Sequence, residues 1–394
     1  MSNLSFMEKL LDGVEMEWKA LGVLIKSVTA PSKLKGEAYR VTGKLPIVDQ
    51  GVEFIAGYTD EDIVPIKAGK YVIFGDHSEH IKYVDFSFVQ GADGIKILSP
   101  ISTNAKYIYY AFQNFYKKKL SYKRHWSTAK ETLIPIPCPE NQKKSLEIQA
   151  EIVHILDTFT ELTTELTAEL IARKKQYNYY RDQLLSFDEG EVEWKTLGEL
   201  TSLITKGTTP KSFESSGISF IKTEAFDGTR INKSKLSYVG ETIHRTFLKR
   251  SILEEGDILF TIAGATIGKS AVVTSDLLPA NTNQALAIIR LHQTVNKKYI
   301  FYILRSNHMK EYIDKSAKGS AQPNLNLRQI NEFCIPLPSP EEQTRIVAIL
   351  DKFDVLTSSI TEGLPREMAL RQQQYEYYRE LLLSFPKLDS EVAA

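Results

Sequence analysis

The longest regular pattern of apolar positions lies between residues 148 and 187, where forty positions contain neither glycine nor proline. Apolar side chains recur there mostly at alternating spacings of four and three residues, at Ile148, Ile152, Ile155, Phe159, Leu162, Leu166, Leu170, Tyr177, Tyr180 and Leu184. This spacing predicts a long helix with a coiled-coil seam. At 1.5 Å per residue the helix would be ~60 Å long, which is well beyond the span of one compact domain.

A second pattern of this kind begins near residue 341, with seam positions at Ile346, Leu350 and Phe353, and continues to residue 386. We expect an interruption at Gly363-Leu364-Pro365, because proline removes a helical hydrogen bond and clashes with the preceding turn. Two long helices with similar seams are expected to pair with each other, and the internal repeat of the chain favours an antiparallel pair.

The chain contains two copies of one plan. MEWKALGVL (16–24) matches VEWKTLGEL (192–200), and HILDTF (154–159) matches AILDKF (348–353). QYNYYRDQLLSF (176–187) matches QYEYYRELLLSF (374–385), and IPIPCPE (134–140) resembles IPLPSPE (335–341). Each copy is therefore expected to begin with a strand at Glu-Trp-Lys, to continue through a globular segment and a proline-rich hinge, and to end in a long helix. The segments between the matching ends do not resemble each other, which suggests one scaffold with two specificities.

The repeat gives the domain boundaries. We expect a first globular domain over 16–147, a helix over 148–187, a second domain over 188–340, a helix over 341–386 and a tail over 387–394. Each domain is expected to be of the α/β (α+β) class, a mixed or antiparallel sheet with short helices. Leu-Ser-Phe at 4–6 precedes the first Glu-Trp-Lys as it precedes the second, so residues 1–15 should pack near the end of the last helix. The termini would then lie close together, in a pseudo-twofold, circular arrangement.

A tandem tetrapeptide, FTELTTELTAEL at 159–170, interrupts the first seam. Its leucines are four residues apart, a stutter that locally unwinds a supercoil. Glu161, Glu165 and Glu169 are like charges at a spacing of four, which costs about 0.2–0.5 kcal/mol per pair, and threonine is a mediocre helix former. The block therefore does not serve helix stability, and we interpret it as a spacer of adjustable length. The alternative is accidental low complexity on an exposed helix.

Composition and charge exclude few classes of protein. The 394 residues include 49 basic and 49 acidic side chains, and the zero net charge argues weakly against nucleic-acid binding. The charge is segregated, however, because the segments 148–187 and 341–394 are acidic and the remainder has an excess of basic residues. Two cysteines cannot form a disulfide framework, no run of 18 apolar residues exists, and the N-terminal stretch lacks a secretory signal, so we expect a cytoplasmic protein with reduced thiols.

Several apparent catalytic motifs are weak. AGATIGKS (263–270) fits a relaxed phosphate-binding loop, but SAVVTS reads as a strand where a helix is needed, so a β-hairpin turn is the better interpretation. Glu-Trp-Lys resembles the end of a nuclease site, yet the chain contains no Pro-Asp. His77 and His80 have no Cys or His companions for zinc, and neither Gly-x-Gly nor an Asp/Asn-Pro-Pro-Tyr run occurs. We predict neither a catalytic nor a metal site.

The residues that suit nucleic acid form one group in each copy. Segment 106–130 holds seven basic residues and no acid, interleaved with aromatics; its candidates are Lys117, Lys118, Lys119, Lys123 and Arg124 for phosphates, with His125 and Trp126 reaching a groove or packing. A solvated basic face is the alternative. In the second copy the candidates are Thr208, Thr209, Lys211, Lys222, Thr223, Lys269, Asn281, Asn283, Gln284, Lys318, Ser320, Gln322, Asn324 and Arg328. Amides and hydroxyls suit base edges and basic groups suit phosphates.

The two-copy plan, GTTPK, ILFTIAGATIGKSAVV, NTNQ and KGSAQPNLNLRQINEFCIPLPSPEEQTRIVAILDKF resemble the specificity subunit of type I restriction–modification enzymes, and LTTELTAEL resembles the IC subfamily. The resemblance covers essentially the whole chain and is weakest across 25–115. It implies two target recognition domains, each reading one half of a split double-stranded DNA target. It also implies helices that set the spacing and bind two modification subunits.

Under this resemblance, the modification subunits carry S-adenosylmethionine and methylate adenine, and restriction subunits add Mg²⁺- and ATP-dependent translocation and cleavage. The chain itself would bind no cofactor and catalyse nothing. Two other interpretations of the residues stay open: a self-sufficient nuclease or NTPase that acts on DNA, and a scaffold whose basic faces bind protein.

Overall fold

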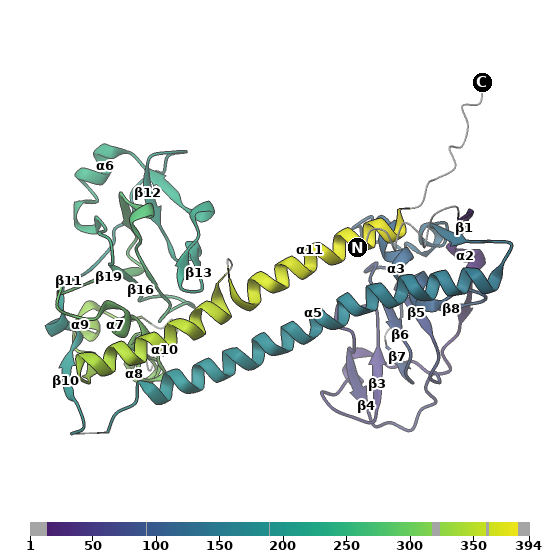
Figure 1. The fold of residues 1–394 in the computed structure, drawn as a ribbon, viewed down its shortest axis with the longest axis horizontal. Helices are drawn as coiled ribbons and strands as arrows, with labels where there is room; N and C mark the ends of the chain where they lie inside the picture. Colours follow the sequence, from purple (N-terminus) through teal and green to yellow (C-terminus); the bar gives the residue numbers. More distant parts are fainter. Residues whose placement is uncertain (1–13, 92, 189, 317–323, 360–361, 385–394) are drawn as a thin grey trace, which may run out of the picture. The chain divides into compact units, whose positions relative to one another are not determined.

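The computed structural model describes residues 14–91, 93–188, 190–316, 324–359 and 362–384. It divides into two compact units (Figure 1). Unit one comprises the chain up to residue 164 together with residues from 370 onward, and unit two comprises residues 165–369. Among the described residues, no helix is both long and apolar enough to cross a membrane.

Unit one contains a four-stranded antiparallel sheet, a three-stranded mixed sheet and a two-stranded ribbon. The four-stranded sheet has the order β2 (Ile25–Val28), β8 (Ile95–Pro100), β5 (Tyr71–Gly75), β6 (Ile81–Val84). The three-stranded sheet has the order β4 (Gly57–Thr59), β3 (Leu45–Val48), β7 (Val89–Gln90), in which β3 and β7 are parallel. The ribbon pairs β1 (Met16–Ala20) with β9 (Leu133–Pro137), and the short helices are α2 (Leu21–Leu24), α3 (Ala105–Phe115) and α4 (Trp126–Ala129).

Unit two repeats this plan. Its four-stranded sheet has the order β11 (Thr201–Lys206), β19 (Leu286–Leu291), β16 (Ile258–Thr261), β17 (Ser270–Val272). Its three-stranded sheet has the order β15 (Ser237–Val239), β12 (Ile218–Ile221), β18 (Ala280–Thr282), and its ribbon pairs β10 (Glu193–Thr196) with β20 (Cys334–Leu337). A small hairpin, β13 (Phe226–Asp227) with β14 (Arg230–Ile231), is added, and the helices are α6 (Glu241–Arg245), α7 (Lys297–Ile303), α8 (Asn307–Ser316) and α9 (Leu327–Asn331). The internal repeat therefore extends through the middles, where the two sequences show no likeness.

Both faces of each four-stranded sheet are covered by a hydrophobic core, and successive side chains of one inner strand belong to opposite cores. In unit one, Val72 and Phe74 of β5 belong to the core beneath helix α3, and Ile73 between them belongs to the core on the other face. Strand side chains point to opposite faces with a period of two, so one strand contributes to two cores. Strand β16 of unit two does the same, with Phe260 on one face and Leu259 on the other.

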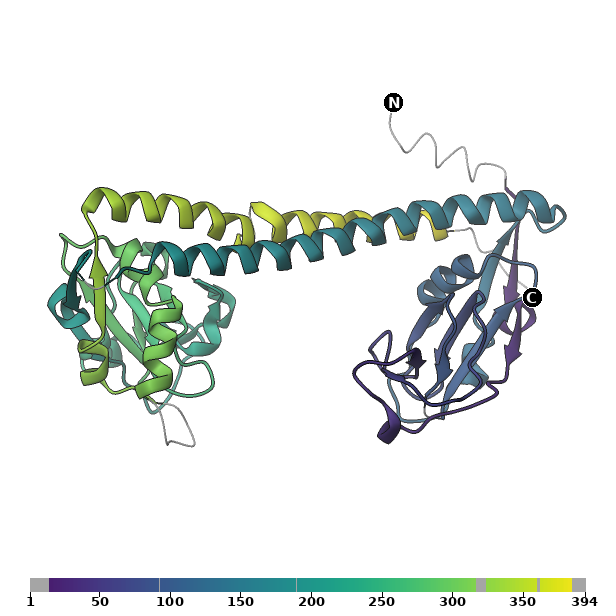
Figure 2. The ribbon, with the colours of Figure 1, turned by 90° about the horizontal axis from the view of Figure 1, so that it is seen from below.

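The long helices are present. Helix α5 (Gln142–Leu184) has 43 residues and runs without a break through the tetrapeptide block, and the second long element consists of α10 (Pro340–Ser358) and α11 (Gly363–Leu383). The break falls between Ser358 and Gly363, directly before the predicted segment, and Leu364 and Pro365 already belong to α11. Gly363 has a φ of +76°, which favours glycine. Within unit one Phe159 stacks on Tyr378 with ring centres 5.2 Å apart, and within unit two Tyr180 stacks on Phe353 at 5.9 Å. The partner numbers fall as those on α5 rise, so the pairing is antiparallel (Figure 2).

The end of the last helix belongs to the same core as the first strand. Leu382 and Leu383 of α11 are buried, and Val14, Met16 and Trp18 pack against the same cluster. This contact is required by the predicted circular arrangement. Most of the predicted N-terminal packing segment (1–15) and the predicted tail (387–394) lie outside the described residues.

The predicted proline-rich hinge is wrong. LIPIP (133–137) and CIPL (334–337) form strands β9 and β20, each paired antiparallel with a Glu-Trp-Lys strand. Proline is tolerated there because each strand has only one neighbour, so the missing N–H need not serve a second ladder. The carbonyl of Pro135 also accepts a hydrogen bond from the buried Tyr107 hydroxyl at 2.7 Å, and Pro336 accepts one from Tyr299 at 2.8 Å.

Candidate nucleic-acid interface

The basic loop of unit one, defined as residues 117–125, leaves the end of helix α3 and returns at α4. The side chains of its five predicted phosphate-binding residues are exposed: Lys117, Lys118, Lys119, Lys123 and Arg124. None of the described ion pairs within 4.0 Å involves any of these five cations. Their charges are therefore available to an external anion, and long cationic side chains on an exposed loop are the residues that neutralise DNA phosphates.

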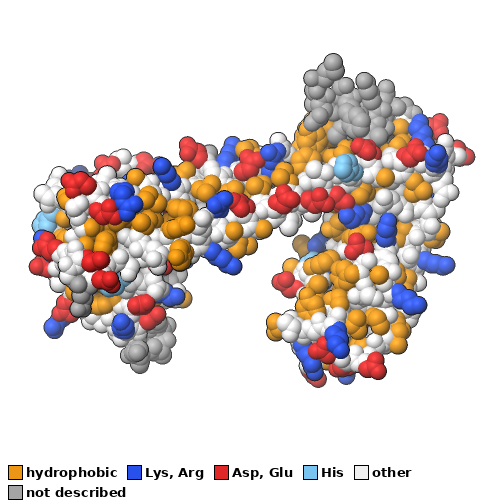
Figure 3. All heavy atoms as spheres, turned by 60° about the horizontal axis from the view of Figure 1, so that its bottom comes forward, with side chains coloured by type: hydrophobic (Ala, Val, Ile, Leu, Met, Phe, Trp, Pro, Cys, Tyr) orange, Lys and Arg blue, Asp and Glu red, His pale blue; other side chains and the backbone are white. Residues whose placement is uncertain are grey.

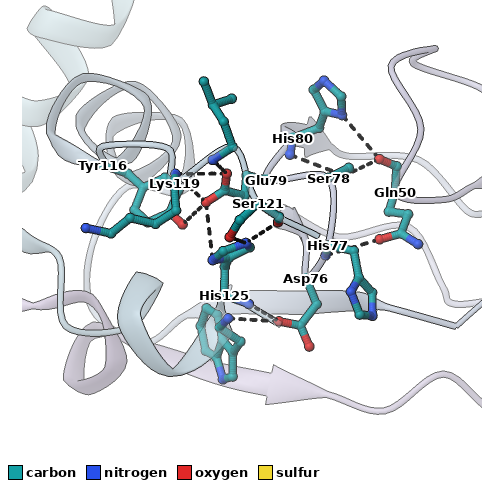
Figure 4. A network of polar contacts seen from close by, with 12 residues as sticks. Gln50, Asp76, His77, Ser78, Glu79, His80, Tyr116, Lys119, Ser121 and His125 are labelled. Carbon is teal, nitrogen blue, oxygen red and sulfur yellow. Dashed lines mark hydrogen bonds and ion pairs between the residues drawn. The ribbon is translucent and has the colours of Figure 1, made fainter. Parts of the chain in front are cut away.

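A buried carboxylate holds this loop in place (Figure 4). Glu79, in the turn between β5 and β6, is 1% exposed and accepts hydrogen bonds from the backbone amides of Lys119 and Leu120 at 2.8–3.0 Å. The hydroxyl of Tyr116 donates to the same carboxylate at 2.6 Å, and His125 Nδ1 lies 3.5 Å away. Burial disfavours the charged form, but these amides, the hydroxyl and His125 together hold the pKa of Glu79 below its usual value.

A second carboxylate fixes the far end of the loop. Asp76 accepts hydrogen bonds from the backbone amides of His125 and Trp126 at 2.9 and 2.8 Å. The His125 ring is 5% exposed and its Nε2 lies 2.7 Å from the carbonyl oxygen of Ser121. Trp126 packs against Phe74 with ring centres 5.9 Å apart. Of the two outcomes considered for His125 and Trp126, reaching a groove or packing, the structure shows packing.

Three further residues of this region are not among the predicted site residues: Tyr122, Gln50 and Glu79. Tyr122 is 93% exposed and its ring stacks on His77 with centres 5.5 Å apart, so a large aromatic face stands next to the cations. Gln50 follows β3, and its side-chain oxygen accepts from the amide of His77 at 3.3 Å (Figure 4). The hint for Gln50 is its place in LPIVDQG, a polar residue directly after an apolar strand. For Glu79, whose partners lie about forty residues away, no hint exists.

In unit two, the parallel pair β12–β18 gathers the predicted polar residues at one edge. Lys222 and Thr223 follow β12, and Asn283 and Gln284 follow β18, so both pairs emerge at the carboxyl ends of neighbouring parallel strands. The hydroxyl of Thr209 donates a hydrogen bond to the side-chain oxygen of Gln284, which is exposed. This edge can present amides, hydroxyls and a cation together, the set that reads base edges and phosphates.

The loop after β11 completes this edge. Thr208 donates its backbone N–H to the carbonyl of Thr282 at 3.0 Å, and a Cβ on the preceding Gly207 would collide with the carbonyl oxygens of Thr282 and Asn283. Glycine is thus required for this close approach. Lys211 is exposed in the same loop, and the Nζ of Lys222 lies 3.9 Å above the ring of Phe213.

The remaining predicted residues of unit two are dispersed. Asn281 is fully buried and bonds to His244 at 2.6 Å and to the carbonyl of Leu248 at 3.1 Å, so its side chain lies inside the domain and does not face a ligand. Arg328 is exposed on α9 and pairs with Glu332 at 2.7 Å. Lys318, Ser320 and Gln322 lie outside the described residues. Lys269 and Asn324 lie on segments other than the β12–β18 edge.

The structure decides against the phosphate-binding loop. AGATIGKS connects β16 to β17, which pair antiparallel, so it is a hairpin turn and no helix follows it. Glu17 and Lys19 pair with each other at 2.8 Å on strand β1, which agrees with a duplicated strand start. In the described part of the chain, no three His, Cys, Asp or Glu side chains are grouped to hold a metal ion.

Each domain is tied to a long helix by the same contacts. In unit one, Asp157 of α5 accepts from Tyr110 at 2.8 Å and from Lys106 at 2.6 Å. In unit two, Asp351 of α10 accepts from Tyr302 at 2.7 Å and Lys298 at 2.6 Å. These aspartates are the shared Asp of HILDTF and AILDKF. The mounting of the two domains is therefore the same, whereas their exposed polar surfaces differ.

Comparison with known proteins agrees with this description. Residues 14–174 and 189–369 match the family described as type I restriction modification DNA specificity domain. The chain is 41% identical to the type I restriction enzyme EcoR124I/EcoR124II specificity subunit of Escherichia coli, over 98% of each chain, and 32% identical to the EcoprrI specificity subunit of Escherichia coli, over 92% and 93%. The crystal structure of the type I restriction-modification system S subunit from M. genitalium shares the fold, with a TM-score of 0.58 at 18% identity over 97% and 99% of the chains.

Proposed function

The chain belongs to the type I restriction–modification DNA-specificity family, and we propose that it directs such an enzyme to a split DNA target, with one half read by each unit. The observation that carries this proposal is the common mounting of two domains with unlike surfaces. Tyr–Asp–Lys contacts fix each domain to a helix in the same way, while unit one presents a basic loop and unit two presents an amide- and hydroxyl-rich strand edge. One scaffold with two different reading surfaces suits an asymmetric target.

The contacts divide by role. Exposed lysines of the basic loop suit phosphates, which set affinity and position but carry no sequence information. Gln284, oriented by the Thr209 hydroxyl, suits the donor and acceptor pattern of a base pair in the major groove. Unit one therefore grips the backbone strongly beside its half-site, and unit two has the richer set of groups for direct readout.

The helices have a surface to offer to modification subunits. Apolar side chains on them stay exposed, among them Tyr179, Ile171, Tyr377 and Val355, with exposed fractions between 43% and 62%. Figure 3 shows hydrophobic side chains on the surface over these helices. A two-helix layer covers only one side of each helix, so an apolar outer side is suited to helices of a partner. We propose two modification subunits, one for each copy of the repeat.

The tetrapeptide block fits a spacer. Three of its threonine hydroxyls form hydrogen bonds within the helix: Thr160, Thr163 and Thr164 each donate to the carbonyl four residues earlier at 2.9–3.0 Å. Leu162 and Leu166 are half-buried, whereas Glu161 and Glu165 are exposed. Four residues can be added or removed without disturbing a buried contact, and the leucine side would return to nearly the same direction. The block also favours the IC subfamily.

Chemistry is assigned to the partners. Curated relatives are specificity subunits, and catalysis resides in the other subunits of such enzymes. We propose that modification subunits supply S-adenosylmethionine, that restriction subunits use Mg²⁺ and ATP, and that the assembly works in the cytoplasm on double-stranded DNA. The alternative of a self-sufficient nuclease or NTPase is not supported, because AGATIGKS is a β-hairpin turn without the helix that the phosphate-binding loop of an NTPase needs.

Long-read mapping of N6-methyladenine tests the proposal. A host without endogenous adenine methylation would express the modification subunit with and without this chain. The expected result is one split motif, two short half-sites around a fixed gap, that appears only when the chain is present. The same unsplit motif with and without the chain would overturn the proposal.

A further inference from the structure

The turns β5–β6 and β16–β17 occupy the same place in the two four-stranded sheets. In unit one, Glu79 donates its backbone N–H to the carbonyl of Gly75 at 2.9 Å, and in unit two Gly268 donates to Thr261 at 2.9 Å. Both donors have a left-handed backbone, with φ of +57° for Glu79 and +88° for Gly268. A non-glycine residue at such a φ is uncommon, so its side chain at this position is informative. Glu79 and Gly268 are therefore equivalent positions of the repeat.

A second pair of hydrogen bonds confirms this alignment. The amide of Gly75 donates to the carbonyl of His80 at 2.9 Å, and the amide of Thr261 donates to the carbonyl of Lys269 at 2.8 Å. The turn of unit two is longer by three residues, but both turns end in the same register. The helices α3 and α7, which come later in the two copies, are also equivalent, because each makes the same Tyr–Asp contact with a long helix.

The two equivalent positions have opposite surroundings. In unit one the Glu79 carboxylate fills the space between its turn and the segment after α3, where backbone amides and a tyrosine hydroxyl hold it. In unit two the glycine contributes no side chain. A pocket of about 360 Å³ lies there, bounded by residues 267–270 of the turn and residues 304–313 after α7.

The lining of this pocket is basic. It includes Arg181, Lys269, Arg305 and Lys310, and no Asp or Glu is among its lining residues. Two of these cations have acidic partners outside the lining, since Arg181 pairs with Asp182 at 2.9 Å and Arg305 lies 3.8 Å from Asp354. The other two, Lys269 and Lys310, have no ion pair among the described residues.

Two polar groups of the residues that line the pocket make no hydrogen bond. The hydroxyl of Ser270 belongs to a residue that is 2% exposed, yet it makes no hydrogen bond with any described residue. The Nη1 of Arg305 is also buried, and its carboxylate neighbour Asp354 at 3.8 Å is too far away for a hydrogen bond. An unmade hydrogen bond in a buried place is costly, and a charged donor makes the cost larger. Apolar walls, including Ile267 and Met309, would strengthen any electrostatic contact inside.

We propose that this pocket of unit two binds a phosphate group, which supplies from outside the negative charge that Glu79 supplies within unit one. Arginine and lysine donors with a serine hydroxyl match phosphate oxygens. The phosphate can come from the DNA backbone or from a free nucleotide. The first source rests on the proposed function and would add a backbone contact beside the second half-site.

The test uses the chain assembled with its modification subunits and a duplex that carries the mapped motif. Arg305→Gln and Lys310→Gln remove pocket cations. Lys315→Gln is the control, because it removes the same charge as Lys310→Gln from the same helix, α8, but outside the pocket lining. For a DNA phosphate, each pocket variant should lower affinity roughly tenfold and reduce the slope of log affinity against log salt by about one, and the control should change neither. Replacing single phosphates by neutral methylphosphonates should locate one position that weakens the intact complex and not the pocket variants.

A second pair of variants separates charge from volume. Gly268→Glu would place in unit two the carboxylate that unit one carries, whereas Gly268→Gln has nearly the same size and the same backbone demand without the charge. The glutamate variant should lose the phosphate contact to a greater extent than the glutamine variant.

The free-nucleotide arm measures ATP and inorganic phosphate binding by calorimetry without DNA. Binding that is lost in Arg305→Gln and Lys310→Gln, with an unchanged DNA salt slope, would identify a nucleotide as the source. Pocket variants that match Lys315→Gln in the DNA, ATP and phosphate measurements would overturn the proposal. That failure is distinct from a failure of the proposed function, in which the complex without any substitution would methylate no split motif.

Discussion

The phenolic oxygen of Tyr110 lies 2.8 Å from a carboxylate oxygen of Asp157 and donates a hydrogen bond to it, which ties helix α3 to helix α5 inside unit one. Tyr302 and Asp351 make the equivalent contact in unit two at 2.7 Å. Burial raises the pKa of Tyr110 above its usual value, so the hydroxyl stays a donor throughout the physiological range. Two domains with unlike sequences are thus mounted on the helices by one chemical device.

Tyr110→Phe should therefore loosen only unit one. The lost bond has a charged acceptor, so the expected loss is about 1.5 kcal/mol. Hydrogen exchange of the α3 amides should become faster by about tenfold while exchange in α7 stays unchanged. Tyr302→Phe is the matched variant and should show the reverse. Equal changes in both helices for either variant would contradict separate mounting.

The Glu79 carboxylate gives unit one a pH dependence of known sign. Its pKa in the folded protein is lowered, from an unfolded value of about 4.3. Its contribution to stability is therefore complete above that unfolded value and is lost as the pH falls through the lower, folded value. Hydrogen-exchange protection of the Lys119 and Leu120 amides, corrected for intrinsic rates, should fall in acid for the intact chain. Glu79→Gln should show weak protection at every pH. The same acid dependence in both would exclude Glu79 as the anchor of the loop.

The cations of the basic loop should act on all DNA alike. Lys118→Gln and Lys123→Gln should each weaken binding to target and non-target duplexes by a similar factor and lower the salt slope by about one. The methylated motif should keep both half-sites. Lys26→Gln, an exposed lysine on β2, serves as the control and should leave the slope unchanged. A variant that altered one base of the motif would show direct readout by the loop instead.

Gln284 should act on sequence. Gln284→Ala removes an exposed amide at the strand edge of unit two, and a lost bidentate contact to a base is worth about 1–3 kcal/mol. The motif mapped with this variant should become degenerate at one position of one half-site and keep the other half. Thr209→Val removes the hydroxyl that orients the amide and should relax the same position to a smaller extent. Degeneracy in both half-sites would contradict the assignment of one half to each unit.

The parts of the fold that the sequence predicts are those with local patterns. The long helices follow from apolar spacing, the break follows from Gly363 and Pro365, and the strand starts follow from the repeated Glu-Trp-Lys. The proline-rich segments suggest hinges because proline usually ends pairing, and only the structure shows that each has a single neighbour. The predicted seam misses Val153 and Leu156, two buried residues of α5 that pack in the core of unit one.

The types of residue in the site could be predicted from the sequence, but not which of them are exposed. Exposed lysines on a loop are visible as a run of charge, and the amides of NTNQ are visible as a polar run. Which of them face outward is decided by long-range packing: Asn281 points inward to His244, whereas Gln284, three residues later, is exposed. The anchor Glu79 contacts a segment forty residues away, and its equivalence to Gly268 appears only when the two turns are compared bond by bond.

Deletion of Thr164–Thr167 would show whether helix α5 sets the distance between the two half-sites. The deletion removes one tetrapeptide from the exposed part of α5, which shortens the helix by ~6 Å and rotates the remainder of the helix by ~40°. Long-read mapping of N6-methyladenine should then show both half-sites unchanged and a shorter gap between them. If the gap kept its length while methylation continued, the helix would not set the spacing and the account of a spacer between two DNA readers would be wrong.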